Sequence, residues 1–211
     1  MNNYEIENRF YLDLETRRMA KMLAHYELYK MIIDKPGDIV EMGVFKGASF
    51  LRWVKFRNIF ENNFSRKIVG FDIFGEFPEA DEIDKATKEK FTKAAGDLGI
   101  SVEELKDKLE KLNLNENVSL VKGDITKTID PYLQENPQTK IALLHVDVDL
   151  LEPTKQSIEK FHSYMVKGGV MVFDDYGFFP GANIVIDEFI RENDLEIKKF
   201  QFVHTPSYVV I

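Results

Sequence analysis

Five short apolar runs rich in Val, Ile and Leu alternate with stretches of helical periodicity, and this alternation limits the folds open to the chain. The runs cover residues 39–43, 67–72, 118–121, 141–146 and 169–173. Such runs are typical of buried strands, and the segments between them are typical of helices. Right-handed crossovers then place the strands in one mostly parallel sheet with helices on both faces. The sequence therefore predicts an α/β protein with a three-layer, Rossmann-like sheet.

The chain shows no linker and no internal repeat, so residues 1–211 are expected to form a single domain. Residues 1–36 precede the first strand and read as a helical extension. Residues 75–116 form a charged helical insertion that is longer than a usual crossover. This insertion is either a decorated crossover with a solvated face or a lid over an acceptor substrate. Two closing runs, 196–203 and 207–211, predict an antiparallel hairpin at the sheet edge.

Composition excludes several classes of protein. The formal net charge is −8 and no long Lys/Arg stripe is present, which disfavours nucleic-acid binding. The absence of cysteine excludes disulfides, thiolate catalysis and Cys-ligated zinc. The N-terminus lacks the pattern of a signal peptide, and no apolar stretch has the length of a membrane helix. We expect a soluble cytoplasmic protein.

Acidic residues follow the fourth and fifth runs. Asp147 and Asp149 come after residues 141–146, and Asp174 and Asp175 come directly after residue 173. The carboxyl ends of parallel strands face the ligand crevice of an open sheet. If the two strands are neighbours, Asp147, Asp174 and Asp175 converge, and a hard divalent cation would offset their mutual repulsion. The sequence therefore predicts a divalent-metal site at this edge.

The first strand-to-helix turn and the ends of the next two strands predict a second set of contacts. Glu41, Gly43 and Gly47 lie at that turn, where glycines let the backbone bend tightly and a ligand approach closely. The turn lacks the third glycine of the dinucleotide fingerprint. Asp72 ends the second strand and could accept hydrogen bonds from ribose hydroxyls. Asp124 follows the third strand and could meet the exocyclic amine of a base. Each acid, taken singly, is more typical of a cap or turn residue, but their ordered appearance at successive strand ends favours the binding role.

The glycines of the first turn and the acids at successive strand ends, taken in their order along the chain, resemble those of a class I S-adenosylmethionine-dependent methyltransferase. More narrowly, they resemble the macrocin O-methyltransferase type, which methylates sugar hydroxyls in a Mg²⁺-dependent way. The resemblance spans residues 38–189. The segments that carry it most specifically are Gly37-Asp38-Ile39-Val40-Glu41-Met42-Gly43-Val44, Gly168-Gly169 and Asp174-Asp175-Tyr176-Gly177.

The resemblance implies a role for each acid and glycine. Glu41, Gly43 and Gly47 would line the methionine side of the cofactor, Asp72 would hold its ribose, and Asp124 would lie beside its adenine. Mg²⁺ or another divalent cation would be held by a carboxylate trio, namely Asp147, Asp174 and Asp175. The 75–116 insertion does not match the family's pattern, which leaves the acceptor open.

Methyl transfer to a hydroxyl also needs a general base. The candidates are His145, Asp147 and Asp149, which strand alternation places on one face. The position of His145 further back along the strand favours a buried structural histidine, whereas Asp149 reads equally as a cap of the following helix. His25 and His204 have no partner at a metal-binding spacing and receive no role.

The expected function is an S-adenosylmethionine-dependent, Mg²⁺-dependent O-methyltransferase. Its partner would be a small hydroxylated acceptor, a sugar or nucleotide-sugar, with no nucleic acid and no membrane. One alternative is a nucleotide-dependent oxidoreductase of Rossmann-like fold, and another is a non-catalytic cofactor-binding or scaffold protein. The N-terminal extension packs either on its own domain or on a neighbouring subunit of a homo-oligomer, and helical periodicity does not distinguish the two.

Overall fold

A seven-stranded sheet in the order β3-β2-β1-β4-β5-β7-β6 forms the centre of the computed structural model, which describes all residues from 1 to 211. The strands are β1 (Asp38–Met42), β2 (Ile68–Asp72), β3 (Val118–Lys122), β4 (Ile141–Val146), β5 (Met165–Phe173), β6 (Lys198–Lys199) and β7 (Ser207–Val210). The first five strands run parallel, whereas β7 is antiparallel to both β5 and β6. The predicted mostly parallel sheet with an antiparallel C-terminal hairpin is confirmed.

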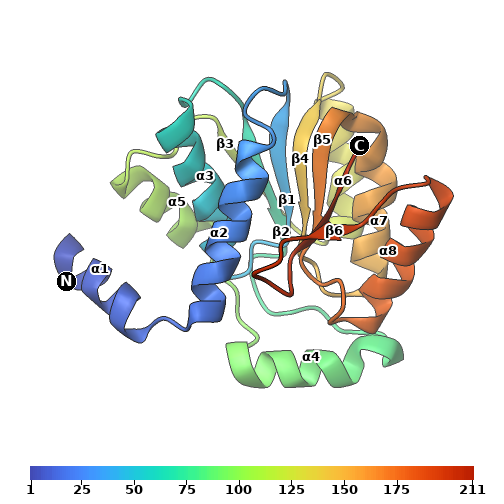
Figure 1. Ribbon diagram of the computed structural model, residues 1–211, viewed down its shortest axis with the longest axis horizontal. Helices are drawn as coiled ribbons and strands as arrows, with labels where there is room; N and C mark the ends of the chain where they lie inside the picture. The colour runs from blue at the N-terminus through green and yellow to red at the C-terminus, as the bar shows by residue number, and fades with distance from the viewer.

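Helices cover both faces of this sheet, as Figure 1 shows. They are α1 (Asn3–Asp13), α2 (Thr16–Lys30), α3 (Ala48–Phe60), α4 (Glu82–Ala95), α5 (Val102–Lys111), α6 (Ile125–Glu135), α7 (Leu151–Phe161) and α8 (Pro180–Glu192), with a short 3₁₀ turn at His162–Tyr164. One hydrophobic cluster joins the sheet to α2, α3 and α5. A second joins it to α6, α7 and α8. The three predicted layers are therefore present.

Strand alternation assigns side chains to the two layers. In β1, Ile39 belongs to the cluster on the α2–α3 side, whereas Val40 and Met42 belong to the cluster on the α6–α8 side. Successive strand residues point to opposite faces, and both faces are covered, so these strands are apolar almost throughout. Glu41 and His145 are exceptions, because both are fully buried and ionisable.

Two predicted boundaries differ from the structure. The fifth strand begins at Met165 rather than at Gly169. Gly168-Gly169 lies inside this strand, at the point where the pairing register with β4 shifts, and not in a turn before it. In the closing hairpin, the first strand has only two residues, Lys198–Lys199, because residues 196–197 are irregular and residues 201–202 form a turn. Neither difference changes the order of the strands.

The extension and the insertion each provide a helix near one edge of the sheet. Helix α1 buries no residue and projects from the body, whereas the second half of α2 packs on α3 (Figure 1). Helix α4 is tied to the N-termini of α7 and α8 by the buried carboxylate of Asp84, which accepts the amides of Leu151 and Gly181 at 3.1 and 2.8 Å. Since those helices begin where β4 and β5 end, α4 lies beside the carboxyl edge.

Candidate active site

Strands β1 and β4 are neighbours although two strands and four helices separate them in sequence, so the strand order reverses between them. In open α/β sheets, the crevice at such a reversal is where ligands bind. The two strands stay close beyond their ends, because the Asp147 amide donates to the Met42 carbonyl at 2.8 Å. Gly43 follows with a φ of 90°, and a Cβ there would overlap the backbone oxygen of Asp147. Only glycine fits this approach.

Asp72 fastens the glycine turn to the end of β2. Its carboxylate accepts the amides of Val44 and Phe45 at 2.7 and 2.9 Å, and that of Phe74 at 2.5 Å. Two of the three amides belong to the turn between Gly43 and Gly47. The acid therefore shapes the turn directly, in addition to the contact with a ribose that the sequence predicts.

Asp124 is the N-cap of α6. Its side chain accepts the Thr126 amide at 3.0 Å and forms an ion pair with Lys127 at 2.8 Å. Lys127 and the bonds to Thr126 lower the pKa of this carboxyl. The capping role foreseen for this acid is present, and contact with adenine stays a prediction.

A cluster of carboxylates lies past the ends of β4 and β5. One oxygen from each of Asp147, Asp149 and Asp175 lies within 4.8 Å of the others. The Asp149 amide also donates to Asp175 Oδ2 at 2.8 Å. Burial and mutual repulsion raise the pKa of Asp147 and Asp175 well above the ordinary range, and raise that of Asp149 to about 8. Crowded oxygen donors of this kind suit a hard divalent cation.

Asp174 points to a different set of partners. Its Oδ2 pairs with the Lys21 ammonium, and its Oδ1 lies 3.6 Å from His145 Nε2. Burial alone would raise the pKa of Asp174, but Lys21 and His145 together hold it well below its usual range. The structure thus brings Asp147 and Asp175 together as predicted, with Asp149 beside them, whereas Asp174 is held by a lysine.

His145 connects this edge to the buried layer beneath α2 and α3. Its Nδ1 lies 3.1 Å from Glu41 Oε1, and since a carboxylate only accepts, this nitrogen carries the proton. The Trp53 indole nitrogen, 3.4 Å from the same atom, is then a packing neighbour rather than a donor. Burial alone would lower the pKa of His145, but contacts with Asp174 and Glu41 raise it to about 10. His145 and Glu41 are both fully buried.

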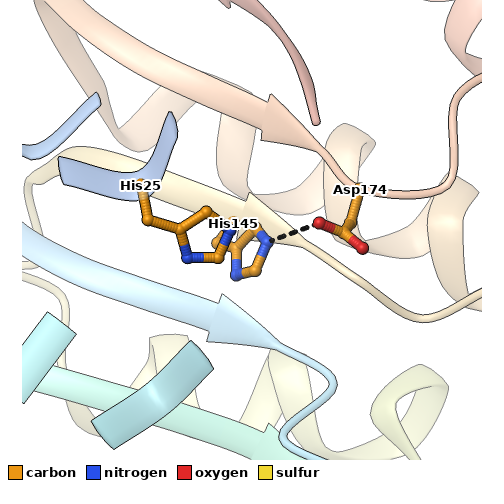
Figure 2. A group of neighbouring side chains, drawn as sticks. All are labelled: His25, His145 and Asp174. Carbon is orange, nitrogen blue, oxygen red and sulfur yellow. Dashed lines mark ion pairs between the residues drawn. The ribbon is translucent and has the colours of Figure 1, made fainter. Parts of the chain in front are cut away.

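His25 completes this buried group. It stacks on Trp53 with ring centroids 4.6 Å apart, and its ring lies 5.2 Å from that of His145. Figure 2 shows His25, from helix α2, beside His145, with Asp174 on the far side of His145. Neither nitrogen of His25 has a hydrogen-bond partner, and burial together with His145 lowers its pKa well below the usual value.

The sequence did not identify Lys21 and His25 as site residues, because a helical pattern does not show which strand a helix packs against. A usable signal existed, however. The two residues are four apart, so they share one face of α2 with the buried Leu28 and its neighbours. A lysine and a histidine on the apolar face of a helix indicate a buried acidic partner.

Three of the six non-glycine residues with positive φ lie at the same edge. Phe45, Phe74 and Asp149 all have positive φ values, of 47°, 49° and 63°. A bulky residue in the left-handed region is costly and persists where its surroundings impose it, often at functional sites. All three follow the end of a strand, respectively β1, β2 and β4.

The fold and this edge are those of the Rossmann-like α/β class, which solved methyltransferases share. A crystal structure of CalS11, described as a calicheamicin methyltransferase, superimposes with a TM-score of 0.85 at 29% identity, covering 100% of this chain and 86% of that one. The structure of the O-methyltransferase NovP has the same fold, with a TM-score of 0.74 and 22% identity over 90% of this chain and 79% of its own.

The chain belongs to the macrocin-O-methyltransferase (TylF) family, whose model matches residues 14–204. It is 28% identical over 157 residues to 8-demethyl-8-(2,3-dimethoxy-alpha-L-rhamnosyl)-tetracenomycin-C 4'-O-methyltransferase from Streptomyces olivaceus. It is 27% identical over 165 residues to demethyldecarbamoylnovobiocin O-methyltransferase from Streptomyces niveus. These alignments cover 72% and 76% of this chain, but only 58% and 60% of the relatives. The resemblance found in the sequence is confirmed.

No helix in the structure combines the length and the apolar character needed to cross a bilayer.

Proposed function

We propose that the protein transfers a methyl group from S-adenosylmethionine to a hydroxyl of a sugar or another small sugar-like acceptor, with a divalent cation at the carboxylate cluster. The observation that carries this proposal is the position of that cluster. Asp147 and Asp149 follow β4 at the strand reversal, Asp175 follows the neighbouring β5, and Asp147 is in backbone contact with the glycine turn after β1. Family membership favours methyl transfer over the oxidoreductase alternative.

The glycine turn and Asp72 are the parts suited to the cofactor. Gly43 and Gly47, with φ values of 90° and 81°, let the backbone turn sharply at the end of β1. Asp72 holds the amides within that turn. Together with Glu41 and Asp124, they are the proposed cofactor residues. Glu41 would contribute from the buried layer below the glycine turn, because its side chain is fully buried.

Asp147 and Asp175 are the proposed cation ligands, with Asp174 as the third. When bound, the cation would fix the acceptor oxygen and stabilise its developing negative charge, and S-adenosylmethionine would supply the methyl group. Methyl transfer forms one C–O bond and breaks one S–C bond, so the acceptor's proton must go to a base. Asp149 is our candidate, because it is partly exposed at the cluster and its raised pKa of about 8 suits a proton acceptor near neutral pH.

His145 is less suited to that role. It has no exposed surface, and its two ring nitrogens already face Glu41 and Asp174. We assign it to holding Asp174 in place. Asp147, as a cation ligand, would be a weakened base.

The test is calorimetric titration with S-adenosylhomocysteine, in chelator and with Mg²⁺, using NAD as the control ligand. We expect S-adenosylhomocysteine to bind and NAD to be silent. Methyl transfer to a panel of hydroxylated sugars and nucleotide-sugars should then require the cation. Asp147→Asn should abolish transfer and leave S-adenosylhomocysteine binding intact, whereas Asp130→Asn, on the surface of α6, should change neither. No binding of S-adenosylhomocysteine would overturn the proposal, and full activity in chelator would remove the cation from it.

A further inference from the structure

The positively charged side chain that pairs with an acid of the site comes from the N-terminal extension. Among all lysine and arginine side chains, only Lys21 lies within ion-pair distance of any of the four aspartates, and it pairs with Asp174 Oδ2. Its side chain is only 18% exposed. A lysine is rarely buried without an acidic partner, so the pair fixes both side chains.

This pair is also the only side-chain hydrogen bond or ion pair that joins residues 1–23 to the rest of the molecule. The other such contacts of this segment are local, between Asn2 and Glu5, Arg9 and Asp13, and Glu15 and Arg17. Residues 16–23 contain no buried residue, and the packed part of α2 begins at Ala24. Besides the partial burial of residues 19–22, this pair with a carboxylate of the site is the polar attachment of the first half of α2.

The charge balance shows why a lysine is needed there. Four aspartates and Glu41 meet at this edge, and the cations in ion-pair contact with them are Lys21 and His145. Without a bound metal, the ammonium supplies positive charge that the clustered acids require. Asp174 pairs with Lys21, and its carboxylate is not grouped within 4.8 Å of both Asp147 and Asp175, the two other acids that the sequence assigns to the cation.

We propose that Lys21 is a built-in counter-cation that a divalent ion replaces on Asp174. Entry of the ion frees Asp174 to join Asp147 and Asp175 as a ligand, and it releases the first half of α2 from the body. Occupancy of the metal site is thus coupled to the docking of the N-terminal segment. This inference rests on the proposed function, because it takes the cluster to be the cation site.

Lys21→Met tests the exchange, since methionine keeps most of the apolar stem and removes the charge. Lys30→Met is the matched control, because Lys30 lies on the same helix but pairs locally with Glu27. Mg²⁺ affinity is measured by calorimetry for both variants and the wild type. Removing a competing charge beside the cluster should tighten Mg²⁺ binding by about tenfold or more in Lys21→Met, with no change in Lys30→Met.

Hydrogen exchange of residues 16–23 provides a readout independent of affinity and activity. In the wild type, exchange should be slow in chelator and faster with Mg²⁺. In Lys21→Met, it should be fast in both conditions. Unchanged or weaker Mg²⁺ binding by Lys21→Met would contradict the proposal that Mg²⁺ replaces Lys21 on Asp174. Slower or unchanged hydrogen exchange in the wild type on adding Mg²⁺ would contradict it as well.

The two proposals fail in different ways. If the wild type and Lys21→Met bind Mg²⁺ equally, the exchange is wrong and the proposed function stands. If none of the three proteins binds Mg²⁺, both the exchange and the role of the cation are wrong, while binding of S-adenosylhomocysteine still decides the methyltransferase assignment. Binding by Lys21→Met alone would support the exchange, with Lys21 as the dominant competitor.

Discussion

Asp84 and Gly181 are in direct contact, and the contact leaves no room for a side chain on the glycine. Asp84 Oδ1 accepts the Gly181 amide at 2.8 Å, while a Cβ on Gly181 would overlap Oδ2 of the same carboxylate. The contact joins α4 of the insertion to the first turn of α8. A buried carboxylate at a helix N-terminus satisfies amides that the helix itself leaves unpaired.

Gly181→Ala should therefore destabilise the protein, although alanine is the better helix former. We expect a loss of about 2–3 kcal/mol, because the carboxylate must move away from amides it satisfies. Chemical denaturation measures the loss, and faster hydrogen exchange in residues 82–95 would locate it at α4. Gly75→Ala is the control, because a Cβ there would meet only the Ile73 carbonyl oxygen at 3.9 Å. Equal stability of the two variants would contradict the steric argument.

Asp72→Ala should affect stability and cofactor binding together. Three backbone amides would lose their charged acceptor, which we expect to cost about 3 kcal/mol of unfolding free energy. The loosened turn should also weaken S-adenosylhomocysteine binding by about tenfold or more. Denaturation and calorimetry provide the two values. Asp107→Ala, at an exposed position on α5, should change neither. Weaker binding with unaltered stability would mean that Asp72 acts on the ligand alone.

Glu41→Ala should be among the most damaging single changes in this chain. It would leave His145 buried without the carboxylate 3.1 Å from its Nδ1. Removing one partner of a buried pair typically costs about 3–5 kcal/mol. Glu41→Gln should cost less, because the amide oxygen still accepts the proton of His145. Thermal and chemical denaturation compare both with Glu89→Ala, an exposed control on α4. A similar loss for alanine and glutamine would show that the negative charge of Glu41, rather than its shape or its hydrogen bond, matters at this position.

Stability without metal should fall as the pH rises. Burial and the neighbouring Asp147 raise the pKa of Asp149 from 3.8 to about 8 in the folded protein. Folding therefore favours the protonated form of Asp149, which contributes to the stability of the protein at low pH. This contribution is lost as the pH rises through the folded-state pKa. The pKa values of Asp147 and Asp175 shift in the same direction.

Mg²⁺ should offset this loss, because ligand carboxylates must be deprotonated to bind it. We expect the increase in melting temperature caused by Mg²⁺, relative to chelator, to be larger at about pH 9 than at about pH 6. Asp149→Asn should reduce this pH dependence. An increase that is equal at both pH values would mean that the cluster does not bind the ion.

Much of the fold could be predicted because the strands are short, apolar and separated by clear helical stretches. The acids at strand ends followed from the same pattern, since parallel strands bring their carboxyl ends to one edge. Sequence could not show that Asp174 turns toward Lys21 while Asp149 joins Asp147 and Asp175. Adjacent residues after a strand point in different directions, and the partner comes from a helix more than a hundred residues away.

The early start of β5 was missed for a related reason. Gly168-Gly169 is typical of a turn, but here it allows close approach, since a Cβ on Gly169 would lie 3.0 Å from the Ala142 carbonyl oxygen. The pairing with β4 that requires this approach is a long-range property. His25 was likewise assigned no role because its neighbours, Trp53 and His145, come from other elements.

The contact between Gly43 and Asp147 has a mechanical consequence. With no gap between the two backbones, the turn proposed for the methyl donor and the acid proposed for the cation cannot move independently. The spacing between the donor and the acceptor's anchoring point is then set by main-chain geometry, not by adjustable side chains. Relatives could change the acceptor by altering surrounding loops while this spacing, and with it the line of methyl transfer, stays constant.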